Sequence, residues 1–206
     1  MNQLSISDHL KTPKTARGRK TQAKILRAAE IEFGERGFHE ASITSITQRA
    51  KVALGTFYVY FESKEELFRA LVIYMGKLTR ATISEKIGDA PDRITAERRG
   101  IEAFIEFTRA NKNNFRIINE AQFVAEDAYR DYYRVFASAY QDNLIASGEE
   151  GEITSGHEEE RAWALIGMNV FLGMSYGLWD ESKPAKEIAD AIGDMIAYGL
   201  AGKRGD

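Results

Sequence analysis

The chain has 206 residues, of which 44% are hydrophobic and 29% charged, a balance that suits a soluble protein with a packed core. It contains no cysteine, which excludes disulfides and thiolate metal sites. The formal net charge of −3 hides a split, because residues 1–64 carry 11 Lys and Arg against 6 Asp and Glu, whereas residues 65–206 carry 17 against 25. A basic front and an acidic remainder favour a nucleic-acid-binding head on a body that stays away from phosphates.

Residues 1–20 show no helical periodicity, and Pro13 and Gly18 interrupt any helix there. We expect a flexible basic arm that either follows DNA phosphates or is only a solubilising tail. The first residues lack the apolar core of a signal peptide, so we expect a cytoplasmic protein. The basic side chains of the arm are Lys11, Lys14, Arg17, Arg19 and Lys20.

The next segment predicts three short helices. Apolar residues at helical spacing predict a first helix that Thr21 caps and Gly37 ends. Ser42 is expected to cap a second helix, and residues 51–53 form a turn before a third helix that runs from Leu54 to about Phe61. Two short helices across a tight turn are typical of a helix-turn-helix, whose second helix enters the DNA major groove.

The remaining chain predicts helices throughout. Ser63, followed three residues later by Glu66, indicates a capping box that opens a fourth helix, and residues 88–91 break that helix. No run alternates in the manner of a strand. The fold class we expect is therefore all-α, with a helix-turn-helix domain over residues 21–66 and a helical domain over residues 67–206. The later helices are expected at about 95–111, 113–122, 126–147, 158–179 and 184–200.

The third predicted helix has the composition of a DNA-reading element. Gly55 and Thr56 allow close approach to base edges, and Tyr58 and Tyr60 offer hydroxyls to phosphates. Lys64 adds a charge at a helix N-terminus, which itself favours a phosphate. An ordinary helical hairpin with surface tyrosines is the alternative. The DNA contacts that we expect come from Ser42, Thr44, Lys51, Leu54, Gly55, Thr56, Tyr58, Tyr60 and Lys64.

The string Gly55-Thr56-Phe57-Tyr58-Val59-Tyr60-Phe61-Glu62-Ser63-Lys64-Glu65-Glu66-Leu67 resembles the signature of the TetR/AcrR family of bacterial transcriptional repressors. Residues 23–38 are similar to the first helix of that family, so the likeness covers about residues 21–70. It implies a homodimeric, ligand-responsive repressor that binds a near-palindromic operator and is released by an effector. It also makes residues 67–206 an effector-binding and dimerisation domain.

Two positions depart from the family pattern. Lys51 stands where the family usually has glycine, so this lysine must adopt the turn conformation without the conformational freedom of glycine. Ala53 stands where the family usually has a capping residue, so the recognition helix lacks a side-chain N-cap.

Nine of the 22 aromatic residues lie between positions 101 and 140, in helices that by the resemblance surround a small-molecule pocket. Aromatic side chains suit a flat or apolar effector, although at helical spacing they also form ordinary cores. Residues 115–123 are similar to a stretch in family members tied to thioester catabolism, which makes an acyl- or aryl-CoA one candidate. Arg109, Lys112 and Arg116 either neutralise such an effector or form a solvated basic face. The pocket residues that we expect are Phe104, Phe107, Phe115, Phe123, Tyr133, Phe136, Tyr140, Met168 and Phe171.

Residues 162–179 are almost wholly apolar, apart from Asn169 and Ser175. A helix that is apolar on all sides is buried, and the resemblance assigns this helix, with the helix at 184–200, to the dimer interface. A membrane span is the alternative, which the acidic flanks of the segment disfavour. The interface residues that we expect are Trp163, Phe171, Met174, Trp179, Ile188, Ile192, Met195 and Ile196.

Catalytic and metal-binding motifs do not stand out. The histidines, His9, His39 and His157, are scattered, and there is no glycine-rich phosphate loop. We therefore expect no enzyme, no metal site and no cofactor. A DNA-binding protein without an effector, or a helical protein-interaction module, remains the alternative to an effector-controlled repressor.

Overall fold

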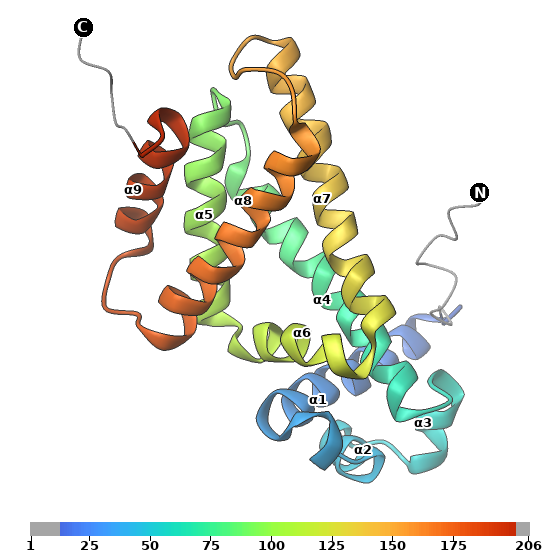
Figure 1. Cartoon of the computed structure of the whole chain (residues 1–206). Coiled ribbons are helices and arrows are strands. Elements are labelled where there is room, and N and C mark those ends of the chain that lie inside the picture. The colour runs from blue at the N-terminus through green and yellow to red at the C-terminus, as the bar shows by residue number, and fades with distance from the viewer. Residues whose placement is uncertain (1–12, 201–206) are drawn as a thin grey trace, which may run out of the picture. The chain divides into compact units, whose positions relative to one another are not determined.

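The computed structural model describes residues 13–200, which form nine α-helices and no strand (Figure 1). The predicted all-α class is confirmed. Expectations for residues 1–12, including the role of Lys11 in the basic arm, fall outside the described residues. The helices are α1 (Ala16–Glu40), α2 (Ile43–Ala50), α3 (Leu54–Tyr60), α4 (Lys64–Ile87), α5 (Arg93–Ala110), α6 (Lys112–Val124), α7 (Glu126–Glu149), α8 (Glu158–Gly173) and α9 (Ala185–Tyr198).

Helix α1 begins six residues earlier than predicted, because its N-cap is Thr15 and not Thr21. The side chain of Thr15 accepts a hydrogen bond of 3.0 Å from the Gly18 amide and thereby caps the helix. Gly18 lies in the first turn and does not break this helix. Glycine fits there because an added Cβ would come within 2.8 Å of the Pro13 Cβ. Residues 16–20 of the expected flexible arm are therefore helical.

Gly37 ends the regular part of α1, as predicted. Its φ of 79° and ψ of 166° interrupt the helix, and glycine adopts a positive φ without steric cost. Helix α8 is also less regular than predicted, because residues Met174–Trp179 continue it as a π-helix.

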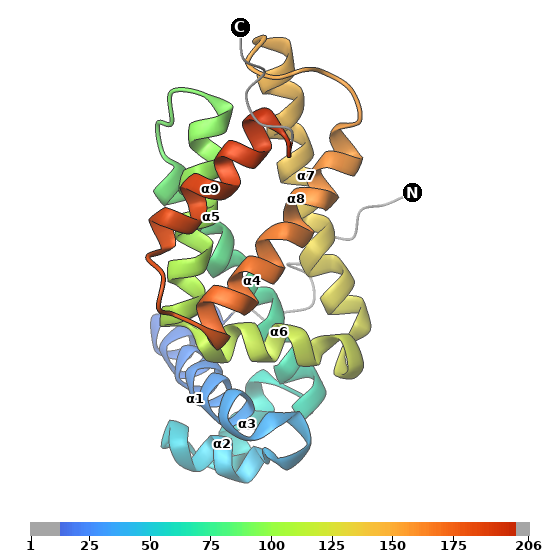
Figure 2. The same cartoon turned by 60° about the vertical axis from the view of Figure 1, so that its left-hand side comes forward.

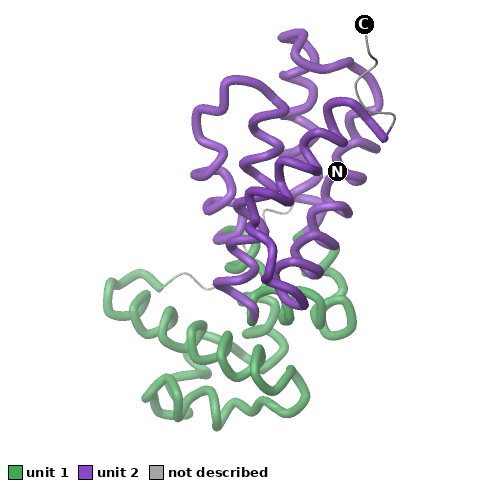
Figure 3. The backbone as a smooth tube through the Cα atoms, turned by 90° about the vertical axis from the view of Figure 1, so that its left-hand side faces the viewer, with its two compact units in different colours: residues 1–77, 113–132 green, residues 78–112, 133–206 purple. Residues whose placement is uncertain are grey.

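The chain divides into two compact units, which Figure 3 colours separately. Unit 1 comprises residues 1–77 and 113–132, and unit 2 comprises residues 78–112 and 133–206. Helix α6 thus belongs to the same unit as the helix-turn-helix. Both α4 and α7 contribute residues to each unit.

The core of unit 1 is built around phenylalanine rings. Phe33 stacks on Phe38 at 5.7 Å between ring centroids, and Phe68 meets both rings edge-on at 5.2 Å. Phe57 of α3 and Phe61, the residue that follows α3, are fully buried, so aromatic packing fixes α3 within its domain.

The core of unit 2 is built around α5, which packs against α8 and α9 (Figures 1 and 2). Ile101 and Ile105 of α5 form a buried cluster with Ala185, Ile188 and Ala189 of the α9 helix. Two glycines allow the close approach of the helix that follows α7. A Cβ at Gly173 would come within 2.6 Å of the Phe104 ring, and one at Gly177 within 2.7 Å of the Thr108 side chain.

Candidate DNA-binding interface

Helix α3 has one buried face and one exposed face. Phe57 is fully buried, whereas Leu54 is 50% exposed, Tyr58 52% and Val59 66%. Gly55 has no heavy atom within 4 Å of an added Cβ, so the backbone there is open to a ligand. Helix α3 therefore presents a small, partly apolar surface with one tyrosine hydroxyl, as a groove-reading helix requires.

The turn before α3 has the two departures that the sequence predicts. Lys51 lies in the left-handed region with φ 54° and ψ 50°. Ala53 occupies the N-cap position of α3 without a side-chain hydrogen bond. In contrast, the predicted cap of α2 is present, because Ser42 and Ser45 form a reciprocal capping box.

A buried carboxylate holds α2 against α1. Glu32 is 2% exposed, and its Oε1 accepts a hydrogen bond of 2.6 Å from Arg49 Nε of α2. Burial alone raises the pKa of Glu32, but hydrogen bonds from Arg49 and Ser45 and the charges of Arg36 and Arg49 hold that pKa below its ordinary value. The pair orients the first helix of the helix-turn-helix.

Lys64 makes contacts that its sequence position does not indicate. Its Nζ donates hydrogen bonds to the carbonyl oxygens of Phe38 at 2.8 Å and Ala41 at 2.9 Å, and it lies 4.3 Å from the centre of the Phe38 ring. The ammonium group thus holds the corner between α1 and α2. This structural role stands beside the phosphate contact expected from the sequence.

A carboxylate from α6 completes the same corner. Glu120 Oε1 accepts a hydrogen bond of 2.8 Å from the Phe38 amide, directly after Gly37. Arg69 of α4 also pairs with Asp127 of α7. Unit 1 therefore contains polar links from α6 and α7 to the helices of the DNA-binding domain.

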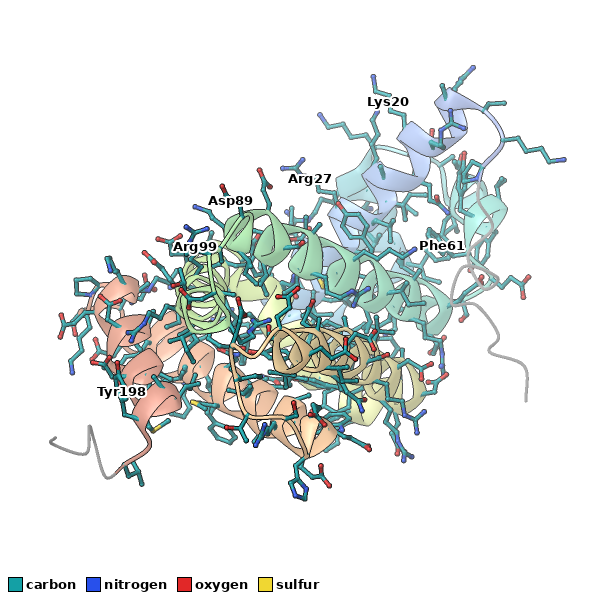
Figure 4. The ribbon with its side chains drawn as sticks, turned by 90° about the horizontal axis from the view of Figure 1, so that it is seen from above. Lys20, Arg27, Phe61, Asp89, Arg99 and Tyr198 are labelled. Atoms are coloured by element: carbon teal, nitrogen blue, oxygen red, sulfur yellow. The ribbon has the colours of Figure 1, made fainter. Side chains whose placement is uncertain are left out.

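The remaining expected DNA contacts lie at or near the surface of unit 1. Ser42, Thr44, Lys51, Leu54, Gly55 and Tyr58 are exposed, and Thr56 and Tyr60 are half-buried. The Tyr60 hydroxyl lies beside Gly18 of α1, 3.6 Å from a Cβ added there. Lys20 and Arg27 project outward from α1 (Figure 4), so part of the expected arm is a basic helix surface. The sequence pattern did not show this surface, because glycine and proline nearby normally indicate a break in a helix.

The expected pocket residues divide between the two units. Phe115 and Phe123 belong to unit 1, whereas Phe104, Phe107, Tyr133, Phe136, Tyr140, Met168 and Phe171 belong to unit 2. Phe123 is 84% exposed and Phe171 is 65% exposed, so neither lines the interior of this chain. We leave both out of the pocket that we propose below, and we also leave out Phe115, because it belongs to unit 1.

The basic residues near the α5–α6 junction bind their own chain. Arg109 donates hydrogen bonds to the carbonyl oxygens of Tyr176 at 2.9 Å and Lys183 at 2.7 Å. Lys112 pairs with Glu181, and Arg116 of unit 1 lies 3.5 Å from the Gly34 carbonyl oxygen. Arg109 and Lys112 therefore bind groups of unit 2, and Arg116 lies against the backbone of unit 1.

A charged network lies inside unit 2, and the sequence pattern gave no sign of it. Glu97 of α5 is 2% exposed, accepts a hydrogen bond from the Tyr140 hydroxyl of α7 and lies 3.0 Å from Arg93 Nε. Burial raises the pKa of Glu97, although Arg93 and Tyr140 oppose the rise, and burial and the carboxylate raise the pKa of Tyr140. A buried carboxylate in an apolar bundle is a feature of functional sites as well as of structural ion pairs.

Exposed aromatic side chains lie on α8, on the π-helix that continues it and at the end of α9. Trp163 is 43% exposed, Trp179 71% and Tyr198 45%, and Figure 4 shows Tyr198 at the surface of α9. The segment Glu158–Trp179 is long and apolar enough to cross a membrane by length and composition, which is weak evidence alone. Met174, Ile192, Met195 and Ile196 are half-buried, whereas Ile188 is 6% exposed within its own chain, so we omit Ile188 from the interface that we propose.

The comparisons with known proteins agree with this architecture. Residues 25–71 match the family model described as bacterial regulatory proteins, tetR family. An uncharacterized HTH-type transcriptional regulator of Bacillus subtilis, YdgC, is 26% identical over 196 residues, which cover 93% of this chain and 98% of YdgC.

Three solved structures share the fold. The fatty acid degradation regulator FadR of Bacillus halodurans has a TM-score of 0.77 and 18% identity, covering 93% of this chain and all of that one. FadR of Bacillus subtilis in complex with stearoyl-CoA has a TM-score of 0.72 and 18% identity, and the match covers 86% of this chain and 98% of that one. AibR in complex with isovaleryl coenzyme A and operator DNA has a TM-score of 0.66 and 17% identity, and the match covers 85% of this chain and 97% of that one.

The matched family model spans α1 to α4 of the described structure, including the exposed recognition helix and the turn before it. With curated relatives that are HTH-type transcriptional regulators and TetR-family structural neighbours, the chain belongs to the tetR family of bacterial regulatory proteins and is a DNA-binding transcriptional regulator.

Proposed function

We propose that the protein is a cytoplasmic homodimeric repressor that binds a near-palindromic operator and is released by an acyl-CoA effector. The DNA-binding part of the proposal rests on the surface of α3. Tyr58 is half exposed, the backbone at Gly55 has no neighbouring atom within 4 Å of an added Cβ, and Phe57 on the opposite face is buried. The nine residues expected to contact DNA remain our proposed interface. Two such helices in a dimer would enter successive major grooves.

The exposed aromatic side chains of α8, of the π-helix that continues it and of α9 support the dimer. Exposed aromatic and aliphatic side chains of this size mark interaction surfaces. A surface depression of about 430 Å³ on α9 adds a receptor for a partner side chain, with Ile192, Met195, Tyr198 and Leu200 in its lining. The proposed interface includes Trp163, Phe171, Met174, Trp179, Ile192, Met195 and Ile196.

Two neighbours of the fold form complexes with coenzyme A thioesters, FadR of Bacillus subtilis with stearoyl-CoA and AibR with isovaleryl coenzyme A, which supports an acyl-CoA as the effector here. The proposed pocket in unit 2 is lined by Phe104, Phe107, Tyr133, Phe136, Tyr140 and Met168. The effector lowers the affinity for the operator only if it binds more tightly to the conformer that binds DNA weakly.

Operator binding tests the proposal directly. Promoter fragments upstream of the protein's own gene are titrated with purified protein by fluorescence anisotropy at several salt concentrations, with and without stearoyl-CoA. We expect a steep fall of affinity with salt and release by the thioester. A scan of thioesters that never changes the affinity would favour a DNA-binding protein without an effector, and no binding to any fragment would favour a helical interaction module.

A further inference from the structure

Helix α8 carries one carboxamide on its inner face. Ala162, Ile166, Asn169 and Gly173 follow each other at helical spacings of four, three and four residues, so they share one face. Ala162, Ile166 and Gly173 are buried and Asn169 is half-buried, so Asn169 lies on the inner side of α8. Phe171, on the opposite side, is 65% exposed.

Asn169 joins the buried charged network of unit 2. The Tyr140 hydroxyl donates a hydrogen bond to Glu97. Burial and Glu97 raise the pKa of Tyr140, and a hydrogen bond from the Asn169 side chain opposes that rise. Glu97 in turn lies 3.0 Å from Arg93 Nε. Three helices, α5, α7 and α8, therefore supply one connected polar cluster.

Counting protons fixes the orientation of the Asn169 carboxamide. A phenol has a single proton, and Tyr140 donates it to Glu97. The phenol oxygen can then only accept, so Asn169 must donate with its amide nitrogen. Asn169 Oδ1 is left over, and it is buried without a hydrogen-bond partner among the described residues. Burying an acceptor without a donor is unfavourable, which points to a group that fills this position when the protein is in use.

We propose that Asn169 Oδ1 accepts a hydrogen bond from an amide N–H of the effector, and that Tyr140 and Glu97 act as positioning residues that turn this oxygen toward the ligand. The inference rests on the proposed function, and it names the part of the effector that is recognised. A coenzyme A thioester carries amide N–H groups in its pantetheine arm, whereas a fatty acid carboxylate has no donor. The site therefore selects acyl-pantetheine over the free acid.

The buried carboxylate fits this role. Replacing a buried ion pair by apolar side chains is often neutral or stabilising, so packing alone does not require Glu97 and Arg93 in the core of α5. A charge-assisted hydrogen bond fixes the Tyr140 hydroxyl more firmly than a neutral one. The network thereby holds one acceptor oxygen at a defined place in an apolar lining.

Calorimetric titration of the full chain with stearoyl-CoA, S-stearoyl-pantetheine and stearate tests the proposal. We expect the wild type to bind both thioesters more tightly than stearate. Asn169→Leu, which keeps the branched shape of the side chain but has no polar atom, is expected to lose about tenfold in affinity for both thioesters and to bind stearate unchanged. Ser175→Ala, the other polar position of the segment 162–179, is the matched control and is expected to bind like the wild type.

Tyr140→Phe provides a second variant if Asn169→Leu does not fold, as judged by circular dichroism. It keeps the ring and removes the anchoring hydroxyl, so the thioesters but not stearate are expected to lose several-fold in affinity. Equal thioester affinity in the wild type and in both variants would mean that Asn169 Oδ1 faces only water, and would overturn the inference alone. A wild type that binds promoter DNA but none of the three ligands would overturn the proposed effector class, and the inference with it.

Discussion

Lys64 Nζ lies 4.3 Å from the centre of the Phe38 ring and donates a 2.8 Å hydrogen bond to the carbonyl oxygen of the same residue. A second hydrogen bond to Ala41 makes Lys64 a connection between the start of α4 and the corner that joins α1 to α2. The DNA-binding domain therefore depends on Lys64 for its own structure.

Lys64→Ala is expected to destabilise unit 1, because the backbone carbonyls of Phe38, His39 and Ala41 lose a charged donor. We expect a loss of about 1–2 kcal/mol in the free energy of unfolding, which calorimetry detects as a melting temperature lowered by a few degrees. Tyr58→Phe is the matched control at an exposed site and is expected to weaken operator binding without a change in melting temperature. Equal melting temperatures of Lys64→Ala and the wild type would mean that Lys64 serves DNA contact alone.

Lys51 offers a test of backbone strain in the turn before α3. Its φ of 54° costs a residue with a Cβ about 1–2 kcal/mol, and Asn tolerates that region better. We expect Lys51→Asn and Lys51→Gly to stabilise the protein, by about 0.5–1 kcal/mol in denaturant titrations.

The same two variants remove a positive charge from the proposed interface. If the Lys51 ammonium group neutralises a phosphate, the slope of log affinity against log salt becomes shallower by about 0.9 when that charge is removed. Lys183→Asn, in unit 2, is the control. Unchanged slopes in the Lys51 variants would remove this residue from the interface.

The corner after α1 depends on glycine. Gly37 has φ 79°, and a Cβ there would lie 3.2 Å from Glu120 Oε1. This oxygen accepts the hydrogen bond from the Phe38 amide. We expect Gly37→Ala to lower the free energy of unfolding by about 1–3 kcal/mol, as measured by urea titration. Gly151→Ala separates the two causes, because Gly151 has φ 78° but no atom within 4 Å of an added Cβ. A smaller loss at Gly151 would assign the difference to Glu120.

The sequence predicted the parts of the structure that depend on local patterns. The Gly55–Leu67 string identified the family, Ser42 marked a helix start, and Gly37 marked a helix end, since each signal lies within one turn of its effect. The contacts of Lys64 were not predictable in this way, because Phe38 and Ala41 lie 26 and 23 residues earlier. Glu97 is one of several glutamates on predicted helices, and its burial depends on Tyr140, 43 residues later.

Burial of Glu97 gives the stability of unit 2 a definite pH dependence. Because its pKa is raised in the folded state, the folded protein binds more protons than the unfolded chain between the ordinary glutamate pKa, about 4.3, and the folded one. The stability contributed by this group is fully present below the unfolded pKa and is lost as pH rises through the folded pKa. The pKa of Glu32 is lowered, so the stability that Glu32 contributes rises with pH. The contribution of Glu97 must therefore be isolated by comparing the wild type with a variant of Glu97.

Glu97→Gln isolates this contribution, since glutamine has a similar shape but does not titrate. We expect the stability of the wild type relative to Glu97→Gln to fall as pH is raised from about 4 to about 7, as measured by urea titrations at each pH. Glu32→Gln is the control, and the corresponding difference there is expected to rise as pH increases toward the ordinary glutamate pKa and to stay constant above it, because the pKa of Glu32 is lowered. A wild-type advantage over Glu97→Gln that grows with pH would show that Arg93 stabilises the carboxylate more than burial disfavours it.

The outer face of α8 and of the π-helix that continues it provides the test of the dimer. Phe171 and Trp179 are 65% and 71% exposed in the single chain, and a carboxylate buried between two copies without a partner is costly. We expect Phe171→Asp and Trp179→Asp to be monomeric at micromolar concentration by light scattering, and to bind operator DNA more weakly because a monomer reads one half-site. Phe123→Asp changes an even more exposed phenylalanine of unit 1 and is expected to keep the wild-type mass. Dimeric Phe171→Asp and Trp179→Asp variants would place the interface elsewhere, and a monomeric wild type would remove the basis for paired recognition helices.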